Sequence, residues 1–377
     1  MAAKDSDIKK AIVTIKILGV GGGGNSVLLR MAKNKVLDVE LIAVNTDAKQ
    51  LALLKEQGIT PLQIGESLTK GRGTGGNLEI GENAAKADEE KLREVMKGAD
   101  LVFVTAGMGG GAGTGAAPVV ARIAKELGIL TIGVVTVPFS FEGARKKRLA
   151  NEGIVKMQAN MDALIAVHND NLLKLPENKH MSLVQAFEEA DNILRQAIRC
   201  IAELILTTGV INVDFADVTS IFRQSESSDA LLGIGESDKG AVQSVQSAVQ
   251  SPLIEKSLEG ARGIILNISG NKDLTLYEVN EATRYIYEHT DPEVNIILGT
   301  VIDEELGERV RATIIATDFV DGMVMKSPKA EVPQSKLAGS FSLDTPAFMD
   351  KAAKVPSFHT KSSFSVPSFH SRPDEKK

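Results

Sequence analysis

Residues 107–118 read GMGGGAGTGAAP, between LVFVTA at 101–106 and VVARIAKELG at 119–128. The first flank is typical of a buried strand and the second of a helix, so the stretch predicts a strand–loop–helix unit. Glycine lets backbone N–H groups converge on an anion, and the start of the following helix adds the positive end of its dipole. A tight turn needs far fewer glycines. We therefore interpret 107–118 as a phosphate-binding loop, with candidate contacts Gly107, Gly109, Gly110, Gly111, Gly113, Thr114 and Gly115.

Short apolar runs alternate with helical stretches through the first half of the chain. The runs lie at 11–20, 39–47, 101–106, 130–139 and 163–170. This alternation predicts an α/β fold with a parallel sheet, in which ligands bind at the carboxyl ends of the strands. The glycine-rich stretches follow those ends.

Two further glycine clusters accompany the first. GVGGGGNS at 19–26 matches GxGxxG, and Asp47 follows the next strand, as in a nicotinamide-dependent oxidoreductase. That fold, however, gives no reason for the second cluster at 107–118 or for KGRGTGGN at 70–77. Because GxxxxGK[ST] is absent, an ordinary P-loop fold is excluded. Three clusters suggest a chain of phosphates held from several sides, with further candidates Gly21, Gly22, Gly23, Asn25, Ser26 and Gly73.

Composition is that of an ordinary cytoplasmic protein. The 377 residues, 43% of them hydrophobic, would usually make two domains and a tail. A single cysteine, Cys200, excludes a disulfide framework, and we expect it to pack in a helix as a small apolar side chain. The charged start MAAKDSDIKK argues against a signal peptide, and no apolar run is long enough for membrane insertion. A net charge of -6 argues against general nucleic-acid binding.

A long helix is predicted over residues 181–209, with a capping box of Ser182 and Gln185 at its start. Phe187 and Asp191 are four positions apart and therefore share a face. An aromatic ring can stack on a base, and a carboxylate can accept from both N1–H and the amine of guanine. On the residues alone, a core phenylalanine and a solvated aspartate are the simpler interpretation.

The acidic stretch NVDFAD follows at 212–217. Asp217 is a candidate N-cap for a helix starting at VTSIF, whereas Asp214 has no such role. About 21 residues separate Asp191 from Asn212, which corresponds to about 30 Å of helix. We therefore expect that the acidic loop cannot reach the nucleotide of its own chain.

Together these motifs resemble the FtsZ family, the tubulin-like GTPases of bacterial cell division. The resemblance spans about residues 12–320 and is carried by GVGGGG at 19–24, by 107–118 and by NVDFAD. It implies a Rossmann-like, parallel-sheet GTP-binding domain, a long central helix, a smaller α+β second domain and a disordered tail. The expected boundaries are 1–180, 181–209, 210–322 and 323–377.

The resemblance also implies roles for single residues. The glycine loops, with Lys146 beside them, would hold the phosphates of GTP or GDP, with Mg²⁺ between phosphate oxygens and Glu142 near the ribose. Asn169, Phe187 and Asp191 would hold the guanine, which reverses the simpler interpretation of the last two.

Head-to-tail assembly is a further implication. The catalytic candidates Asn212, Asp214 and Asp217 of one chain would enter the nucleotide pocket of the next and position the attacking water. Hydrolysis would then occur only in the polymer, a filament of the division ring beneath the inner membrane.

Some positions depart from the family pattern. Ser26 stands where the family usually has Asn, Ala112 where it has Thr, and Lys146 where it has Arg. Gly76-Asn77-Leu78 replaces the usual Ala-Asn-Pro. Ala112 removes a hydroxyl near the expected γ-phosphate, and Lys146 replaces a planar fork by a point charge. Slow hydrolysis is therefore expected, and the alternative is a scaffold that co-assembles with a competent partner.

The second domain is predicted to contain strands at 263–270, 294–303 and 310–319 around a helix at 277–289. After Met325 the composition changes to Lys, Ser and Pro, which is typical of a flexible tail. Within it DTPAFM at 344–349 resembles the family's peptide for membrane-anchor and division proteins. Two copies of VPSFH follow it. They are either further docking units or a low-complexity repeat without a function.

Overall fold

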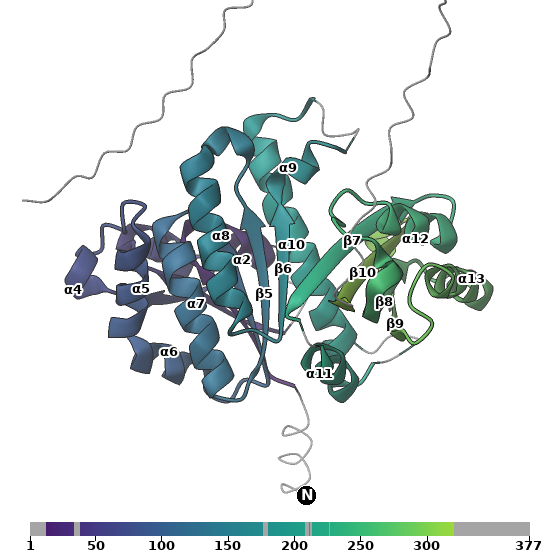
Figure 1. Ribbon diagram of the computed structural model, residues 1–377, viewed down its shortest axis with the longest axis horizontal. Helices are drawn as coiled ribbons and strands as arrows, with labels where there is room; N and C mark the ends of the chain where they lie inside the picture. Colours follow the sequence, from purple (N-terminus) through teal and green to yellow (C-terminus); the bar gives the residue numbers. More distant parts are fainter. Residues whose placement is uncertain are drawn as a thin grey trace, which may run out of the picture. The chain divides into compact units, whose positions relative to one another are not determined.

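A single ten-stranded sheet organises the chain, in the order β3-β2-β1-β4-β5-β6-β7-β10-β8-β9 (Figure 1). The computed structural model describes residues 13–33, 38–175, 180–207, 211, 213–225 and 227–319. The tail prediction over 323–377, with DTPAFM and both VPSFH copies, lies outside these residues. The four domain boundaries stay predictions.

The first half of the chain contributes six strands that pair in parallel, as the sequence predicts. The strands are β1 (Ile15–Val20), β2 (Glu40–Asn45), β3 (Thr60–Gln63), β4 (Leu101–Gly107), β5 (Leu130–Val137) and β6 (Ala163–His168). The helices are α2 (Gly21–Lys33), α3 (Ala48–Lys55), α4 (Glu66–Thr69), α5 (Leu78–Ala87), α6 (Glu89–Met96), α7 (Gly111–Glu126), α8 (Ala144–Gln158) and α9 (Asn169–Leu172), with the 3-10 turn η1 (Ser140–Glu142). Among these six strands, β3 alone was not predicted, because its sequence TPLQ is short and half polar and the strand lies at the sheet edge.

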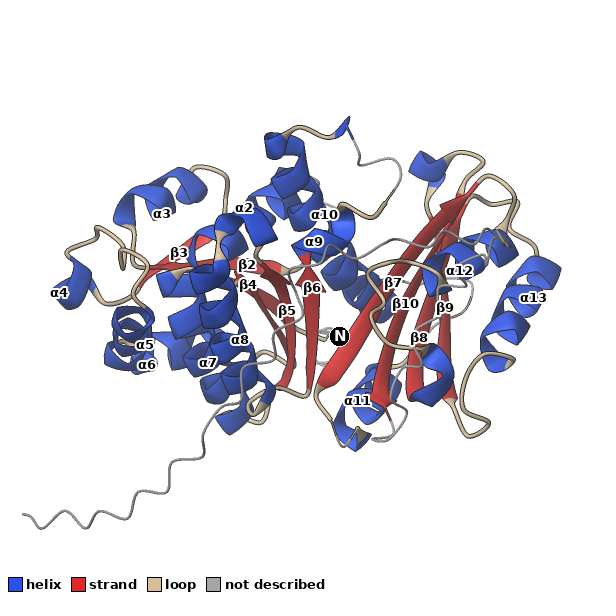
Figure 2. Cartoon of the chain, turned by 45° about the horizontal axis from the view of Figure 1, so that its top comes forward, coloured by secondary structure: helices blue, strands red, loops and turns tan. Residues whose placement is uncertain are grey.

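Helices cover both faces of this parallel part (Figure 2). Alternate residues of β4 face opposite sides: Phe103 joins the core beneath α2 and α3, while Val102 and Val104 join the core beneath α5, α7 and α8. Burial on both faces explains why these strands are almost continuously apolar.

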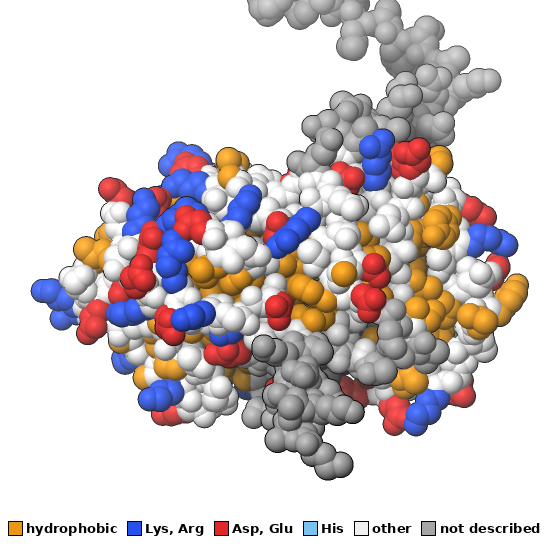
Figure 3. All heavy atoms as spheres, turned by 90° about the horizontal axis from the view of Figure 1, so that it is seen from below, with side chains coloured by type: hydrophobic (Ala, Val, Ile, Leu, Met, Phe, Trp, Pro, Cys, Tyr) orange, Lys and Arg blue, Asp and Glu red, His pale blue; other side chains and the backbone are white. Residues whose placement is uncertain are grey.

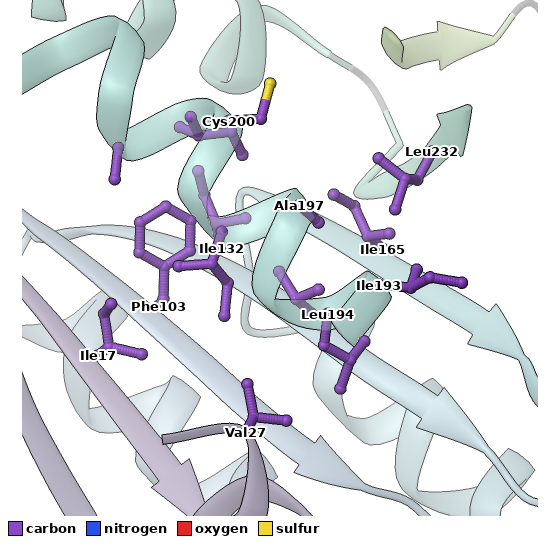
Figure 4. Close-up of a cluster of buried hydrophobic side chains, with 14 of the residues drawn as sticks. Ile17, Val27, Phe103, Ile132, Ile165, Ile193, Leu194, Ala197, Cys200 and Leu232 are labelled. Atoms are coloured by element: carbon purple, nitrogen blue, oxygen red, sulfur yellow. The ribbon is translucent and has the colours of Figure 1, made fainter. Parts of the chain in front are cut away.

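The predicted central helix is present as α10 (Leu183–Leu206), a helix of 24 residues. Its capping box is formed as predicted: Ser182 Oγ accepts from Gln185 N at 3.3 Å, and Gln185 Oε1 accepts from Ser182 N at 2.8 Å. Figure 4 shows Leu194 and Ala197 of α10 among the apolar side chains of the sheet. Cys200 is buried in the same helix, as expected, and burial raises the pKa of its thiol.

The remaining strands complete the sheet. In chain order the elements are α11 (Phe215–Gln224), β7 (Asp229–Ser237), α12 (Ala241–Val249), η3 (Leu258–Gly260), β8 (Ala261–Gly270), α13 (Leu276–Tyr287), β9 (Asn295–Ile302), η4 (Glu304–Leu306) and β10 (Val310–Phe319). Strands β8, β9 and β10 confirm the three predicted strands. β7 pairs antiparallel with β10, but it meets β6 in parallel through only two register pairs, Leu164 with Asp229 and Ile165 with Ala230.

Strand β7 was missed by the sequence analysis, and its glycines explain why. Gly233 and Gly235 interrupt an otherwise apolar run, which lowers the expected strand propensity. Both face α12: a Cβ on Gly235 would lie 2.3 Å from Ala248 N and from Ser244 O. The residues that weaken the strand pattern are therefore those that allow the helix to pack closely. No helix of the described residues is long and apolar enough to cross a membrane.

Candidate functional site

Two of the glycine clusters lie in direct backbone contact at the carboxyl ends of β1 and β4. A Cβ on Gly21 would lie 2.5 Å from Gly113 N, and one on Gly23 would lie 2.8 Å from Gly107 Cα. Gly21 also has a φ of +71°, which favours glycine. The starts of α2 and α7 can therefore approach each other only because these positions lack side chains.

The third cluster packs against the second. A Cβ on Gly111 would lie 2.1 Å from Thr74 Oγ1 and 2.8 Å from Asn77 N. Asn77 caps α5 by accepting from Glu79 N at 2.9 Å, so its side chain holds this loop in place. Gly73 has a φ of +80° and no atom within 4 Å of a built Cβ, so it borders open space. The sequence-based expectation that the three clusters meet agrees with this geometry.

The backbone at the two helix starts favours the binding of an anion. The first N–H groups of α2 and α7 have no partner within their helices, and both helix dipoles place their positive ends here. Neither helix has an acidic residue in its first turn. Gly22, Gly23 and Gly110 are exposed. These features together are those of a phosphate-binding site, which we name the phosphate cradle.

Three polar residues predicted to bind the nucleotide form hydrogen bonds within the loops. Thr114 Oγ1 accepts from Gly109 N at 2.7 Å, and Ser26 Oγ donates to Gly22 O at 3.2 Å. Asn25 is fully buried; with its amide oriented to satisfy its neighbours, it donates to Gly19 O at 2.7 Å. These side chains shape the cradle, and a direct contact with phosphate stays a prediction.

Glu142 and Lys146 lie beside the second cluster, after β5. Glu142 Oε1 accepts from Phe139 N at 3.0 Å, and Lys146 Nζ donates to Glu142 Oε2 at 3.0 Å. A Cβ on Gly109 would lie 3.0 Å from Lys146 O, so this turn adjoins the phosphate cradle. The Glu142 carboxylate therefore has two partners within the protein.

The predicted base-binding residues lie at the start of α9 and in the first half of α10. Asn169 is 4% exposed, and its Oδ1 is buried without a hydrogen-bond partner. Phe187 is 40% exposed and meets Phe139 edge to face, with ring centroids 5.5 Å apart. Asp191 is largely buried. The simpler interpretation, a core phenylalanine and a solvated aspartate, is therefore wrong on both counts. An exposed aromatic ring on α10 and an unsatisfied acceptor at the start of α9 are both features that a bound base could use.

Arg30 is the residue that the sequence analysis did not find. Its Nε donates to Asp191 Oδ2 at 3.2 Å, and its terminal nitrogen lies 3.4 Å from Glu188 Oε1. Burial raises the pKa of Asp191, while the Arg30 guanidinium opposes that shift. Since 161 positions separate the two residues, no local sequence signal could have paired them.

Asp47, which the sequence analysis compared with the acidic residue of a nicotinamide-dependent oxidoreductase, serves as a helix cap. Its carboxylate accepts from Lys49 N at 2.9 Å and from Gln50 N at 3.2 Å at the start of α3. Within the described part of the chain, no three His, Cys, Asp or Glu side chains lie close enough to hold a metal ion.

The acidic loop lies at the other end of α10 (Figure 1). Asp214, not Asp217, occupies the N-cap position of α11, so the capping expectation was wrong by one turn; no side-chain cap bond forms. Both carboxylates are exposed. Arg223 of α11 donates to Gly128 O at 2.9 Å, in the turn that precedes β5, so α11 adjoins the amino ends of the parallel strands. Asn212 lies outside the described residues.

The phosphate cradle and the acidic loop thus face opposite ways. The cradle lies at the carboxyl ends of the strands, and a helix of 24 residues spans about 36 Å. Figure 3 looks onto the opposite end, where hydrophobic side chains lie among acidic and basic ones. From Asp191 to the last residue of α10, Leu206, the helix rises about 22 Å. The full separation of about 30 Å between Asp191 and Asn212 stays a prediction.

Comparisons with known proteins identify the family. Residues 14–177 match the Tubulin/FtsZ family, GTPase domain, and residues 228–320 match the FtsZ family, C-terminal domain. An empty FtsZ dimer from M. jannaschii is 38% identical, covers 84% of this chain and 91% of its own, and superposes with a TM-score of 0.78. The chain belongs to the FtsZ family. A point mutant of that M. jannaschii FtsZ, also 38% identical, gives a TM-score of 0.79 with 84% and 95% covered.

A more distant relative shows the same fold. CetZ2 from Haloferax volcanii, solved as a GTPγS-bound protofilament, is 21% identical with a TM-score of 0.67, covering 82% of this chain and 95% of that one. Membership of the FtsZ family makes this chain a member of a family of GTPases that bind GTP and GDP. The oxidoreductase alternative is thereby excluded.

Proposed function

We propose that this protein is a GTPase that polymerises head to tail into the filaments of a cell-division ring. The observation that carries this proposal is the separation of the cradle from the acidic loop. At the cradle, Glu142 binds Lys146, Asp47 caps α3 and Asp191 pairs with Arg30. The exposed carboxylates of Asp214 and Asp217 lie at the opposite end. A second subunit stacked on the first would bring them together.

The chemistry would consist of positioning and charge stabilisation. Backbone N–H groups of 21–23 and 110–113 would bind the phosphates, and Phe187, Asn169 and Asp191 would bind the guanine. Asn212, Asp214 and Asp217 of the next subunit would orient the attacking water and accept its proton. Mg²⁺ would be held mainly by phosphate oxygens and water, where it neutralises developing charge.

Filament growth follows from the geometry of such a contact. The two complementary surfaces lie at opposite ends of one subunit, so the contact is heterologous and does not close on itself. The dimer of the 38%-identical M. jannaschii protein supports self-association. Loss of the γ-phosphate would remove part of the surface that the next subunit contacts, so turnover would weaken the filament.

A slower scaffold is the second candidate function, and Ala112 favours it. This residue lies in the first turn of α7, is partly exposed, and provides no hydroxyl where the family usually has Thr. Lys146, in place of the usual Arg, is engaged by Glu142. Such a chain would bind GTP and co-assemble with a competent partner.

Attachment to the membrane is proposed through the tail. DTPAFM at 344–349 resembles the family's docking peptide for membrane-anchor proteins, and such a peptide would hold the filament in the cytoplasm at the division site. Its support is the sequence alone.

Measuring GTP turnover against protein concentration tests the proposal. A shared site requires a steep onset above a threshold concentration, coincident with assembly by light scattering. A rate per subunit that is independent of concentration would contradict it. A low, flat rate with normal GTP binding would favour the scaffold.

A further inference from the structure

Arg30 connects the two helices that would hold opposite ends of a nucleotide. It projects from the last turn of α2 to the Asp191 carboxylate on α10. Both side chains are partly buried, with 33% and 17% exposed. A pairing held from two elements fixes the carboxylate more firmly than the rotamers of a single helix would.

The same helix also begins at the phosphate cradle. Gly22 lies in the first turn of α2, and Arg30 follows eight residues later, about 12 Å along the axis. That distance is of the order of the length of a nucleotide. Helix α2 can therefore define both where the phosphates lie and where the base-reading carboxylate lies.

The contact leaves the carboxylate ready to bind a base. Arg30 donates to Oδ2, and no described residue donates to Oδ1. An ionised carboxylate only accepts, so it fits the adjacent N1–H and amine of guanine; a protonated one carries an O–H that would oppose the amine.

We propose that Arg30 is a positioning residue for guanine selection, which holds the Asp191 carboxylate ionised and oriented toward the base. The inference rests on the proposed function, because it assumes that GTP is the ligand.

The electrostatic surroundings of Asp191 support this role. Burial raises the pKa of its carboxyl, and the neighbouring Glu188 raises it further. Arg30, from α2, is the cation that lowers it. Without Arg30 the pKa rises further, so the ionised fraction, and GTP affinity with it, falls as pH decreases.

Equilibrium binding of GTP and of ITP, which lacks the exocyclic amine, tests the inference. Full-length wild type, Arg30→Gln and Arg30→Lys are compared below the assembly threshold at about pH 6 and about pH 8. We expect Arg30→Gln to lose about tenfold in GTP affinity at the lower pH, less at the higher, and to discriminate less against ITP. Arg30→Lys should retain most of the affinity. Lys33→Gln removes an exposed cation from the same helix turn and should match wild type.

The outcomes separate this inference from the proposed function. Unchanged GTP affinity in Arg30→Gln would overturn the inference alone. Equal losses for GTP and ITP at both pH values would also overturn it, because that pattern indicates damaged packing of α2 on α10. A wild-type chain that does not bind GTP would overturn the proposed function itself. Thermal unfolding of each variant verifies that it is folded.

Discussion

At the scale of single residues, the cradle depends on positions where a methyl group has no room. A Cβ on Gly23 would meet Gly107 Cα at 2.8 Å and Gly107 N at 2.9 Å, and backbone cannot move aside as a flexible side chain can. One glycine earlier, a Cβ on Gly22 would meet only the end of the Gln50 side chain, at 3.7 Å. Neighbouring glycines of one motif therefore differ in what they tolerate.

Gly23→Ala should destabilise the nucleotide-free protein by about 1–3 kcal/mol, the usual cost of overpacking. Gly22→Ala is the matched control. It should leave the free energy of unfolding unchanged or raise it by up to about 1 kcal/mol, because alanine favours helix. Urea unfolding measures both. Equal stability of the two variants would show that the loops do not pack as closely as described.

Ala112→Thr should raise GTP turnover per subunit, because it would restore a hydroxyl donor near the γ-phosphate. Removing one donor to a transition state commonly costs on the order of 100-fold, so a rise of about tenfold or more is expected. Ala112→Val has the same shape without the hydroxyl and should give no rise. Steady-state phosphate release measures the rates. Similar rates for Thr and Val would show that the hydroxyl is dispensable here.

The residue scale also shows where reading a sequence succeeds. The glycine clusters are local and their spacing carries their function, so their convergence was predictable. Arg30 was not, because its partner lies 161 positions away on another helix. The sequence analysis assigned the N-cap of α11 to Asp217, whereas the structure has Asp214 there. Both acids lie near the start of the helix, and the sequence does not show at which of them the helix begins.

At the scale of elements, α10 is connected to the last strands by buried charges. Arg199 donates to Glu203 within the helix and lies 3.6 Å from Asp303, which follows β9. Arg311 of β10 lies 3.9 Å from the same Asp303. Glu203 is only 6% exposed, and burial raises the pKa of its carboxyl although Arg199 opposes the shift.

Arg199→Leu should destabilise the protein by about 3 kcal/mol near neutral pH, because it leaves Glu203 buried without its cation. The pKa of Glu203 would then lie further above its unfolded value. Stability is therefore lost as pH rises through that interval, and the deficit against wild type should shrink toward about pH 5. Denaturant unfolding at about pH 5 and about pH 8 measures the effect.

The exposed Arg284 of α13 provides the control for this prediction. It pairs with Glu281 and Glu288 on the surface of one helix, and its side chain is 63% exposed. Arg284→Leu should change stability by less than about 0.5 kcal/mol at either pH. A deficit in Arg199→Leu that is independent of pH would mean that lost packing, not the uncompensated carboxyl, is responsible.

Elements differed in how well the sequence predicted them. The central helix carries a capping box that marks its start and an apolar stripe that continues along its length, so its presence was predictable. Strand β7 carries two glycines that only the packing of α12 explains, and β3 is a short edge strand containing Pro61. Both misses are positions where tertiary packing overrides local propensity.

At the scale of the molecule, the two functional surfaces are joined by one helix and one sheet. The parallel and mixed parts of the sheet meet at β6 and β7 through two register pairs, while α10 runs from the base-binding residues toward the acidic loop. Under the proposed head-to-tail assembly, each subunit would present half of a site at either end. The nucleotide pocket and the acidic loop can therefore be tested by inactivating each in a separate chain.

Asp214→Ala should bind GTP like wild type but hydrolyse almost none, because in the proposed filament its exposed carboxylate would act only in the neighbour's pocket. Asp191→Ala should be inactive for the complementary reason: it keeps the acidic loop but binds guanine poorly.

Mixed in equal amounts, the two inactive variants should regain activity, since one provides an intact pocket and the other an intact loop. Random stacking produces that pairing at about one quarter of contacts, which sets the expected ceiling relative to wild type. Asp273→Ala removes an exposed acid from the second domain and should behave as wild type. Turnover is measured with sedimentation of the same mixtures. No recovery in mixtures that co-sediment would mean that each chain hydrolyses GTP with its own residues, and the proposed role of the acidic loop would then be wrong.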